Sequence, residues 1–246
     1  MTSITMLIAL FVVIIGVCTA QKVPVSVYYE SLCPDSQAFI SEQLYPAMKS
    51  PLGRFVDLKL IPYGKSNRST IGSDVEFTCH HGPNECYGNK VHSCAIEHIQ
   101  VNSFQNQYTR ESLILEYVNC LMQLTRNFPD QLFPGKRCAE QFKLENWQVI
   151  EACANQTEGS KLLEKNGELT DTLKPSLTSV PTITFRHQQD ESQALALVNF
   201  RSAVCKKMQS PLPVECTSLP NSAPVQSATT YLMGLSSLGL ILALKI

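Results

Sequence analysis

The chain has 246 residues, with 20 basic and 21 acidic side chains and ten cysteines. This length suffices for one domain with a sizeable core, or for a domain that carries a large insertion. The balanced charge, without any long basic block, argues against a nucleic-acid partner.

The first twenty residues predict a secretory signal peptide. Residues 6–17 form an apolar run of signal-peptide length, and Cys18, Thr19 and Ala20 are small residues before the expected cleavage ahead of Gln21. The usual basic start is missing. The alternative is an uncleaved membrane anchor, for which the run is short.

Residues 23–64 predict a βαβ unit. Residues 23–30, VPVSVYYE, alternate apolar and polar side chains as a strand does. Pro34 suits a first helical turn, so a helix is expected from there to about residue 48. Residues 55–64 alternate again, which predicts a second strand parallel to the first.

The middle of the chain predicts an inserted segment. Residues 65–105 look irregular and rich in cysteine. Two helical patterns follow, which we interpret as core-forming faces and not as a cofactor site. The residues on these faces are Leu113, Tyr117, Cys120, Leu121 and Leu124, then Leu144, Trp147, Ile150 and Ala154.

The last third of the chain predicts the second half of the fold. Residues 179–185 read as a strand that opens with Pro181, and residues 194–208 mix strand and helix signals. We expect a β-hairpin followed by a helix. The complete order predicts an α/β, thioredoxin-like fold over residues 21–216, with a helical, disulfide-rich insert at about 65–175.

The cysteine count indicates a disulfide-built chain with one thiol left over. Nine cysteines remain after the signal peptide, and a secreted protein with so many is expected to pair them. An odd number leaves one free or paired with another molecule, and eight cysteines allow 105 connectivities. The sequons at Asn67 and Asn155 predict glycosylation in the same compartment.

Cys33 is the candidate nucleophile. It precedes the predicted helix, whose N-terminal N–H groups favour a thiolate, while the charge of Asp35 disfavours it. Ser36 occupies the place of the second cysteine of a dithiol site; its hydroxyl can donate a hydrogen bond to the sulfur. A monothiol still forms a mixed disulfide, but an external thiol or another cysteine of the protein must release it.

Residues 217–246 lie outside the predicted fold. A polar, proline-containing linker leads to an apolar tail at residues 231–246, and Asn221, Ser222 and Ala223 are small residues suited to a glycolipid-anchor attachment site. The alternatives are a short membrane span and a soluble or interfacial tail. Membrane association through this tail is therefore expected in two of the three readings.

The stretch 79–94, CHHGPNECYGNKVHSC, contains three cysteines and three of the five histidines. Cysteine and histidine are zinc ligands, but the spacing lacks the paired short knuckle of structural zinc sites. Disulfides are the simpler interpretation in an oxidising compartment, so we expect no metal here.

The same stretch resembles the signature of the gamma-interferon-inducible lysosomal thiol reductase (GILT) family. That signature reads Cys, Gln, His, Gly, two variable residues, Glu, Cys, two variable residues, Asn, four variable residues and Cys. His80 replaces the Gln. The matching residues are Cys79, His81, Gly82, Glu85, Cys86, Asn89 and Cys94. The resemblance covers about residues 23–216.

The resemblance implies a thiol reductase that opens protein disulfides at acid pH in endosomes and lysosomes. The family's active site is Cys-x-x-Cys, which here is Cys33-Pro34-Asp35-Ser36, and its signature serves mainly as a disulfide-bonded surface apart from the reacting centre. Val180-Pro181-Thr182 resembles the cis-proline loop that binds substrate; an ordinary proline at a strand start is the alternative. Losing one active cysteine fits the odd count, so Cys33 is expected to be free and eight cysteines bridged.

Three hypotheses remain. The first is a monothiol oxidoreductase of protein disulfides, with weak reductase, isomerase or trapping activity, no bound cofactor, an external thiol reductant, and an exposed thiol at Cys33. The second is a catalytically silent binding protein, secreted or surface-anchored, on the same scaffold. The third is a homodimer linked through Cys33. Location is expected to be extracellular, or in endosomes and lysosomes.

Overall fold

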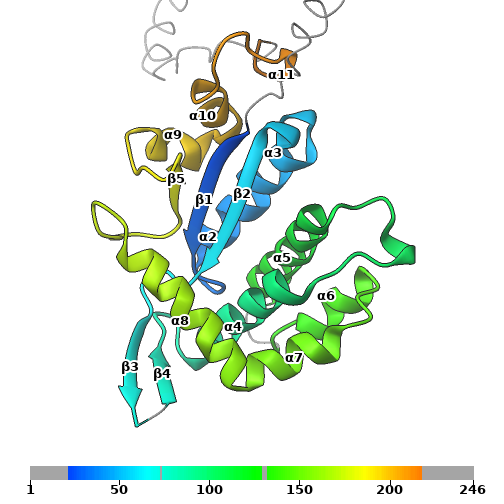
Figure 1. The fold of residues 1–246 in the computed structure, drawn as a ribbon, viewed down its shortest axis with the longest axis vertical. Helices are drawn as coiled ribbons and strands as arrows, with labels where there is room; N and C mark the ends of the chain where they lie inside the picture. The colour runs from blue at the N-terminus through cyan, green and yellow to red at the C-terminus, as the bar shows by residue number, and fades with distance from the viewer. Residues whose placement is uncertain (1–21, 73, 129–131, 218–246) are drawn as a thin grey trace, which may run out of the picture.

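The computed structural model describes residues 22–72, 74–128 and 132–217 (Figure 1). Its main sheet has the order β2-β1-β5, and its strands are β1 (Val23–Tyr29), β2 (Val56–Pro62) and β5 (Thr182–Phe185). β1 and β2 are parallel, which confirms the predicted βαβ unit, and β5 is antiparallel to β1. All of β1 except Pro24 is buried, as expected for the central strand.

The predicted helix after β1 is present. It runs through α2 (Pro34–Ala38), a π-helical stretch (Phe39–Leu44) and α3 (Tyr45–Lys49). Pro34 stands at the first helical position, where a missing N–H costs nothing. Phe39, Ile40 and Leu44 are buried, so this segment is anchored to the core by its apolar face.

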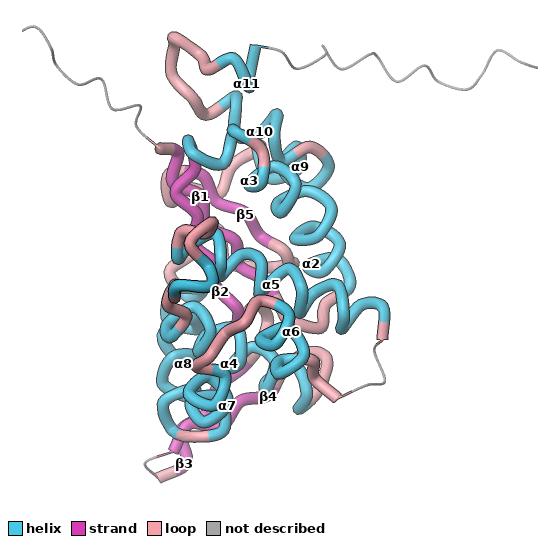
Figure 2. Tube along the Cα trace, turned by 90° about the vertical axis from the view of Figure 1, so that its right-hand side faces the viewer, coloured by secondary structure: helices cyan, strands magenta, loops and turns pink. Residues whose placement is uncertain are grey.

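Between β2 and β5 the described residues form five α-helices, a short 3-10 helix (Ser103–Gln105) and a small hairpin. One of these helices contacts α3, because Tyr45 and Lys49 are hydrogen-bonded to Glu116, and in Figure 2 the five helices lie towards the end of the molecule away from α10. They are α4 (Pro83–His98), α5 (Arg110–Asn127), α6 (Gly135–Gln141), α7 (Trp147–Asn155) and α8 (Thr157–Asp171). The hairpin consists of β3 (Asn67–Ile71) and β4 (Asp74–Thr78). Most buried apolar residues of the sheet and of these helices form one cluster, and Tyr28, Ile61 and Leu173 form a second, smaller one.

The residues predicted for the two helical faces lie where expected. All of them are buried except Leu124, which is partly buried and packs against the same cluster. The interpretation of these residues as core is therefore confirmed.

The prediction that residues 65–105 are irregular is wrong. The hairpin β3–β4 and the 16-residue helix α4 occupy most of this range. The sequence hides α4 because its buried side includes polar residues such as Asn89, His92 and Ser93, so no apolar stripe marks the helix.

The expected β-hairpin near the C-terminal end is also wrong. Within the described residues, β5 is followed by a single bridge between Phe185 and Gln188, and then by helices. These helices are α9 (Ser192–Val198), α10 (Phe200–Lys206) and α11 (Val214–Thr217). Asn199 divides the apolar run, because its side chain accepts a hydrogen bond from the Ser202 N–H and caps α10.

Four disulfides confirm the predicted count. The pairs are Cys79–Cys86, Cys94–Cys153, Cys120–Cys138 and Cys205–Cys216. Cys33 is the free cysteine of the described chain, as expected. The parallel βαβ unit, the antiparallel β5 and the helical insert together make an α/β fold of the thioredoxin-like type.

The predicted signal peptide and the predicted anchor tail lie outside the described residues. Within residues 22–72, 74–128 and 132–217, no helix is both long and apolar enough to cross a bilayer.

Candidate active site

Cys33 lies in the turn between β1 and α2, at the position that caps the helix. Its backbone is extended, with φ −69° and ψ 122°, and its carbonyl accepts the first helical hydrogen bond, from the Gln37 N–H at 3.0 Å. The residue is only 6% exposed. The expectation of an exposed thiol is therefore wrong, because neighbouring segments cover the turn.

Ser36 is fully buried one turn into α2. Its hydroxyl oxygen accepts a hydrogen bond from the Glu30 N–H at 3.4 Å. No hydrogen bond joins Ser36 to Cys33 in the described part of the chain. The hydroxyl thus links the helix to the end of β1, which differs from the thiolate contact that the sequence suggested.

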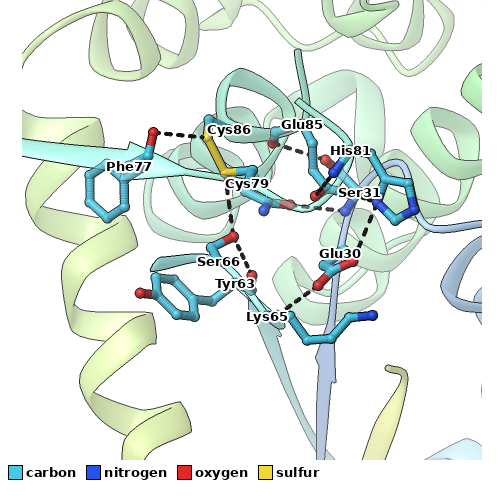
Figure 3. Close-up of a disulfide and its surroundings, with 11 residues drawn as sticks. Glu30, Ser31, Tyr63, Lys65, Ser66, Phe77, Cys79, His81, Glu85 and Cys86 are labelled. Carbon is cyan, nitrogen blue, oxygen red and sulfur yellow. Dashed lines mark hydrogen bonds and ion pairs between the residues drawn. A yellow bond between two sulfur atoms is a disulfide. The ribbon is translucent and has the colours of Figure 1, made fainter. Parts of the chain in front are cut away.

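Two side chains approach the sulfur of Cys33 from other segments. A carboxylate oxygen of Glu30, the Sγ of Cys33 and a ring nitrogen of His81 all lie within 4.8 Å of one another. Glu30 ends β1, and His81 belongs to the turn before α4, so the cluster joins residues about fifty positions apart. Figure 3 shows the His81 ring turned towards the Glu30 carboxylate.

Glu30 is completely buried. Its Oε1 accepts the Lys65 N–H at 2.6 Å, whereas its Oε2 has no hydrogen-bond partner and lies 3.4 Å from Nδ1 of His81. Burial raises the pKa of this carboxyl, opposed by the hydrogen bond from Lys65. On the Oε2 side, the rings of His80 and His81 lie 3.5 and 3.4 Å away and are placed to offset its negative charge.

Glu85 holds His81 in place. Its Oε1 accepts the His81 N–H at 3.0 Å, and its Oε2 lies 2.6 Å from Nδ1 of the same residue. Glu85 is itself buried in the first turn of α4, where a carboxylate is favoured by the helix dipole. Gly82 precedes the helix with φ 85°, a conformation that suits glycine.

Asn89 of the signature fixes the turn that carries Cys33. Its Oδ1 accepts the Ser31 N–H at 2.9 Å. The Ser31 hydroxyl donates to the carbonyl of Glu85 at 3.3 Å, and Gln37 donates to the Ser31 carbonyl at 3.2 Å. The backbone before Cys33 is thus bonded to α4 on one side and to α2 on the other.

The signature therefore places one of its residues, His81, beside the candidate nucleophile Cys33. The expectation that it lies apart from that centre, as a disulfide-bonded surface, differs from the position of His81 beside Cys33. Its cysteines do serve a structural purpose: Cys79 and Cys86 close the turn that carries His81, and Cys94 ties α4 to α7. All three signature cysteines are in disulfide bonds, so their sulfurs are not available as thiolate ligands for a metal.

Sequence reasoning missed Glu30. A glutamate after an apolar strand looks like the solvated end of that strand, and nothing local shows that the segments around Lys65 and His81 cover it. The sequence contained one signal, the histidine and glutamate at positions 81 and 85 of the signature. It did not show which residue of another segment they contact.

Pro181 opens β5. The Val180–Pro181 bond is cis. In the antiparallel register Thr182 pairs with Tyr28. Pro181 therefore lies at the same end of the sheet at which β1 leads into Cys33.

Both sequon asparagines, Asn67 and Asn155, are exposed.

A free thiol before the first helix of a thioredoxin-like βαβ unit, with a proline-led strand at the same end of the sheet, defines a thiol–disulfide oxidoreductase of the thioredoxin-like class. Comparison with known proteins gives the family. The sequence model described as gamma interferon inducible lysosomal thiol reductase (GILT) matches residues 24–142. GILT-like protein 1 of Drosophila melanogaster is 54% identical over 223 residues, covering 88% of this chain and 89% of that protein.

Two further similar proteins support the same family. The gamma-interferon-inducible lysosomal thiol reductase-like protein of Anopheles gambiae is 53% identical over 221 residues, covering 89% of this chain and 87% of that protein. The gamma-interferon-inducible lysosomal thiol reductase of Carassius auratus is 29% identical over 198 residues, covering 80% and 73%. The chain belongs to the GILT family. Among solved structures, oxidised BdbD from Bacillus subtilis matches with a TM-score of 0.47 and 13% identity, over 69% of this chain and 78% of that one.

Proposed function

We propose that the protein is a monothiol oxidoreductase that acts on protein disulfides through Cys33. The observation that carries the proposal is the state of this residue: it is the free thiol at the helix start, beside His81 and Glu30, while the resolving position holds Ser36. Pro181 is proposed to present backbone to an extended substrate.

The chemistry balances as thiol–disulfide exchange. The Cys33 thiolate attacks one sulfur of a substrate disulfide, a new bond forms between these two sulfurs, and the other substrate sulfur leaves as a thiolate that takes up a proton. Attack on the mixed disulfide by another substrate cysteine releases Cys33 and isomerises the substrate, with no net electron transfer. Net reduction consumes two equivalents of an external thiol.

His81 supports the thiolate in this proposal. A ring nitrogen of His81 within 4.8 Å of the sulfur is placed to accept the thiol proton, and the resulting imidazolium lies opposite the thiolate. Glu85 orients the ring, and Glu30 offsets its positive charge.

Location and partners follow the relatives. The proteins from goldfish and mouse are described as lysosomal thiol reductases. We propose that this chain likewise follows the secretory pathway to the cell exterior or to endosomes and lysosomes, glycosylated at Asn67 and Asn155. Its substrates are disulfide-containing or unfolded proteins, and its tail attaches it to a membrane.

A substitution at position 36 separates this proposal from the silent binding protein. Ser36→Cys restores a dithiol at a buried position that differs by one atom, so we expect a large gain in reduction of a disulfide-bonded protein at acid pH with an external thiol. Cys33→Ser is expected to abolish both that gain and the wild type's mixed disulfides, detected by mass after acid quenching. No gain in Ser36→Cys, together with no mixed disulfide in the wild type, would favour the binding protein.

A further inference from the structure

The cluster around Cys33 is also a set of metal ligands. Glu30 offers a carboxylate oxygen, Cys33 a sulfur and His81 a ring nitrogen, and the three atoms lie within 4.8 Å of one another. In a tetrahedral zinc site the ligand atoms are about 3.3–3.6 Å apart, given metal–ligand bonds of about 2.0–2.3 Å. A contraction of about 1 Å, within the reach of side-chain rotation, brings the three atoms onto one ion.

A second observation points to a cation at this place. Oε2 of Glu30 is buried and has no hydrogen-bond donor, although its partner Oε1 is bonded to Lys65. The nearby Nδ1 of His81 is already 2.6 Å from Glu85, so Oε2 of Glu30 has the rings of His81 and His80 at 3.4 and 3.5 Å but accepts no hydrogen bond from either. A buried carboxylate oxygen without a donor is costly, and a bound cation removes that cost.

Glu85 completes the arrangement. A histidine that binds a metal is usually oriented by a carboxylate behind it, and losing that carboxylate commonly weakens the site about 10–100-fold. Glu85 holds both the backbone and the ring of His81, so the ring is fixed before any ion arrives.

The donor set selects the kind of ion. A thiolate with an imidazole and a carboxylate suits borderline ions such as Zn²⁺, whereas Ca²⁺ and Mg²⁺ require oxygen ligands. Three protein ligands leave a fourth position open for water. The expectation of no metal rested on the cysteines of residues 79–94, and this cluster takes its sulfur from Cys33 instead.

We propose that Glu30, Cys33 and His81 bind one thiophilic divalent cation of the zinc type, and that the bound ion occupies the Cys33 thiolate and blocks disulfide exchange. Binding releases the thiol proton to solvent and changes no oxidation state. The blocking effect rests on the function proposed above; the binding itself does not.

Cadmium is the probe, because a Cd²⁺–thiolate bond has an ultraviolet charge-transfer band that reports sulfur ligation. The whole protein, freed of metal by a chelator, is titrated with Cd²⁺. We expect a saturable band at one ion per chain, displaced by Zn²⁺. Cys33→Ser should abolish it, and His81→Ala and Glu30→Gln should each weaken binding at least about tenfold.

His187→Asn is the control. His187 is exposed, lies outside the cluster and has a φ of 65°, which asparagine tolerates. Its loss should leave the affinity unchanged. Circular dichroism checks the fold of each variant, and His81→Ala, at a partly exposed residue, serves if Glu30→Gln does not fold. A band that survives Cys33→Ser, or an affinity that His81→Ala leaves unchanged, would overturn the site.

Activity separates the two proposals. If metal-free protein forms mixed disulfides and Zn²⁺ at saturation does not suppress them, the blocking effect is refuted while the proposed function stands. If Cd²⁺ binds at Cys33 but metal-free protein forms no mixed disulfide, the proposed function fails while the metal site stands.

Discussion

His92 makes the stability of this protein sensitive to acid. The ring is completely buried in α4, its Nδ1 is 2.9 Å from the Tyr29 hydroxyl, and its Nε2 has no hydrogen-bond partner. Burial therefore lowers the pKa of His92 from 6.5 to about 3. The neutral ring is thus the native form across the pH range of endosomes and lysosomes.

The direction of the effect follows from proton linkage. In the unfolded chain the pKa of His92 returns to about 6.5, so below that pH the unfolded state binds a proton that the native state does not. Stability is complete above pH ~6.5 and falls as the pH drops towards about 3. Between pH 7 and pH 5 the loss amounts to about 2 kcal/mol from this residue alone.

The measurement compares the wild type with His92→Gln. Urea unfolding with the disulfides intact, at pH 7 and at pH 5, gives two free energies of unfolding for each protein. We expect His92→Gln to be less stable at pH 7, because packing is lost, but to lose about 2 kcal/mol less than the wild type on acidification. His187→Asn is the control: it removes an exposed histidine at φ 65°, a conformation that asparagine tolerates, and should leave the acid loss unchanged. Acid losses for wild type and His92→Gln that agree within about 0.5 kcal/mol would refute the reasoning.

Two further predictions concern the turn before Cys33. Asn89→Ala leaves the buried Ser31 N–H without an acceptor and should cost about 1–3 kcal/mol in urea unfolding; a cost below about 0.5 kcal/mol would contradict the assigned bond. Gly64→Ala puts a Cβ 2.3 Å from the Glu30 side chain at φ 61°, and should cost well over 1 kcal/mol. Gly72→Ala, at φ 65° with open space around it, isolates the backbone part of that cost, and a Gly64→Ala no worse than this control would show that the contact is unimportant.

Local signals were sufficient for the first half of the fold. Alternation in β1 and β2 and a proline at the helix start are properties of neighbouring residues, and the parallel pair follows from the handedness of short crossovers. α4 was missed because its buried face is polar, and its side chains are satisfied by partners far along the chain, as Asn89 is by Ser31. Periodicity does not detect a helix of this kind.

In the candidate site, too, residues marked by a local motif were predicted, and residues placed by contacts between distant segments were not. Cys33 and Ser36 were found because they occupy the two cysteine positions of a Cys-x-x-Cys motif directly after a predicted strand. Glu30 was missed and His81 was assigned to a remote surface, because their closeness to the sulfur comes from a contact across some fifty residues. Glu30 and His81 come close to Cys33 because α4 packs against the end of β1 in the folded protein.

Ser36, at the position where a dithiol site would have its second cysteine, is part of the hydrogen-bonded turn around Cys33. Ser36 is buried and bonded to the Glu30 N–H, so it anchors the same turn that Asn89 and Gln37 hold. A sulfur at this position accepts a hydrogen bond only weakly, so Ser36→Cys exchanges a 3.4 Å contact for a second thiol at small structural cost. The buried acid, the oriented histidine and the thiol at the N-cap position surround this turn. If Cys33 is the nucleophile, as we propose, these groups support the first step of disulfide exchange, and a thiol other than residue 36 must supply the second.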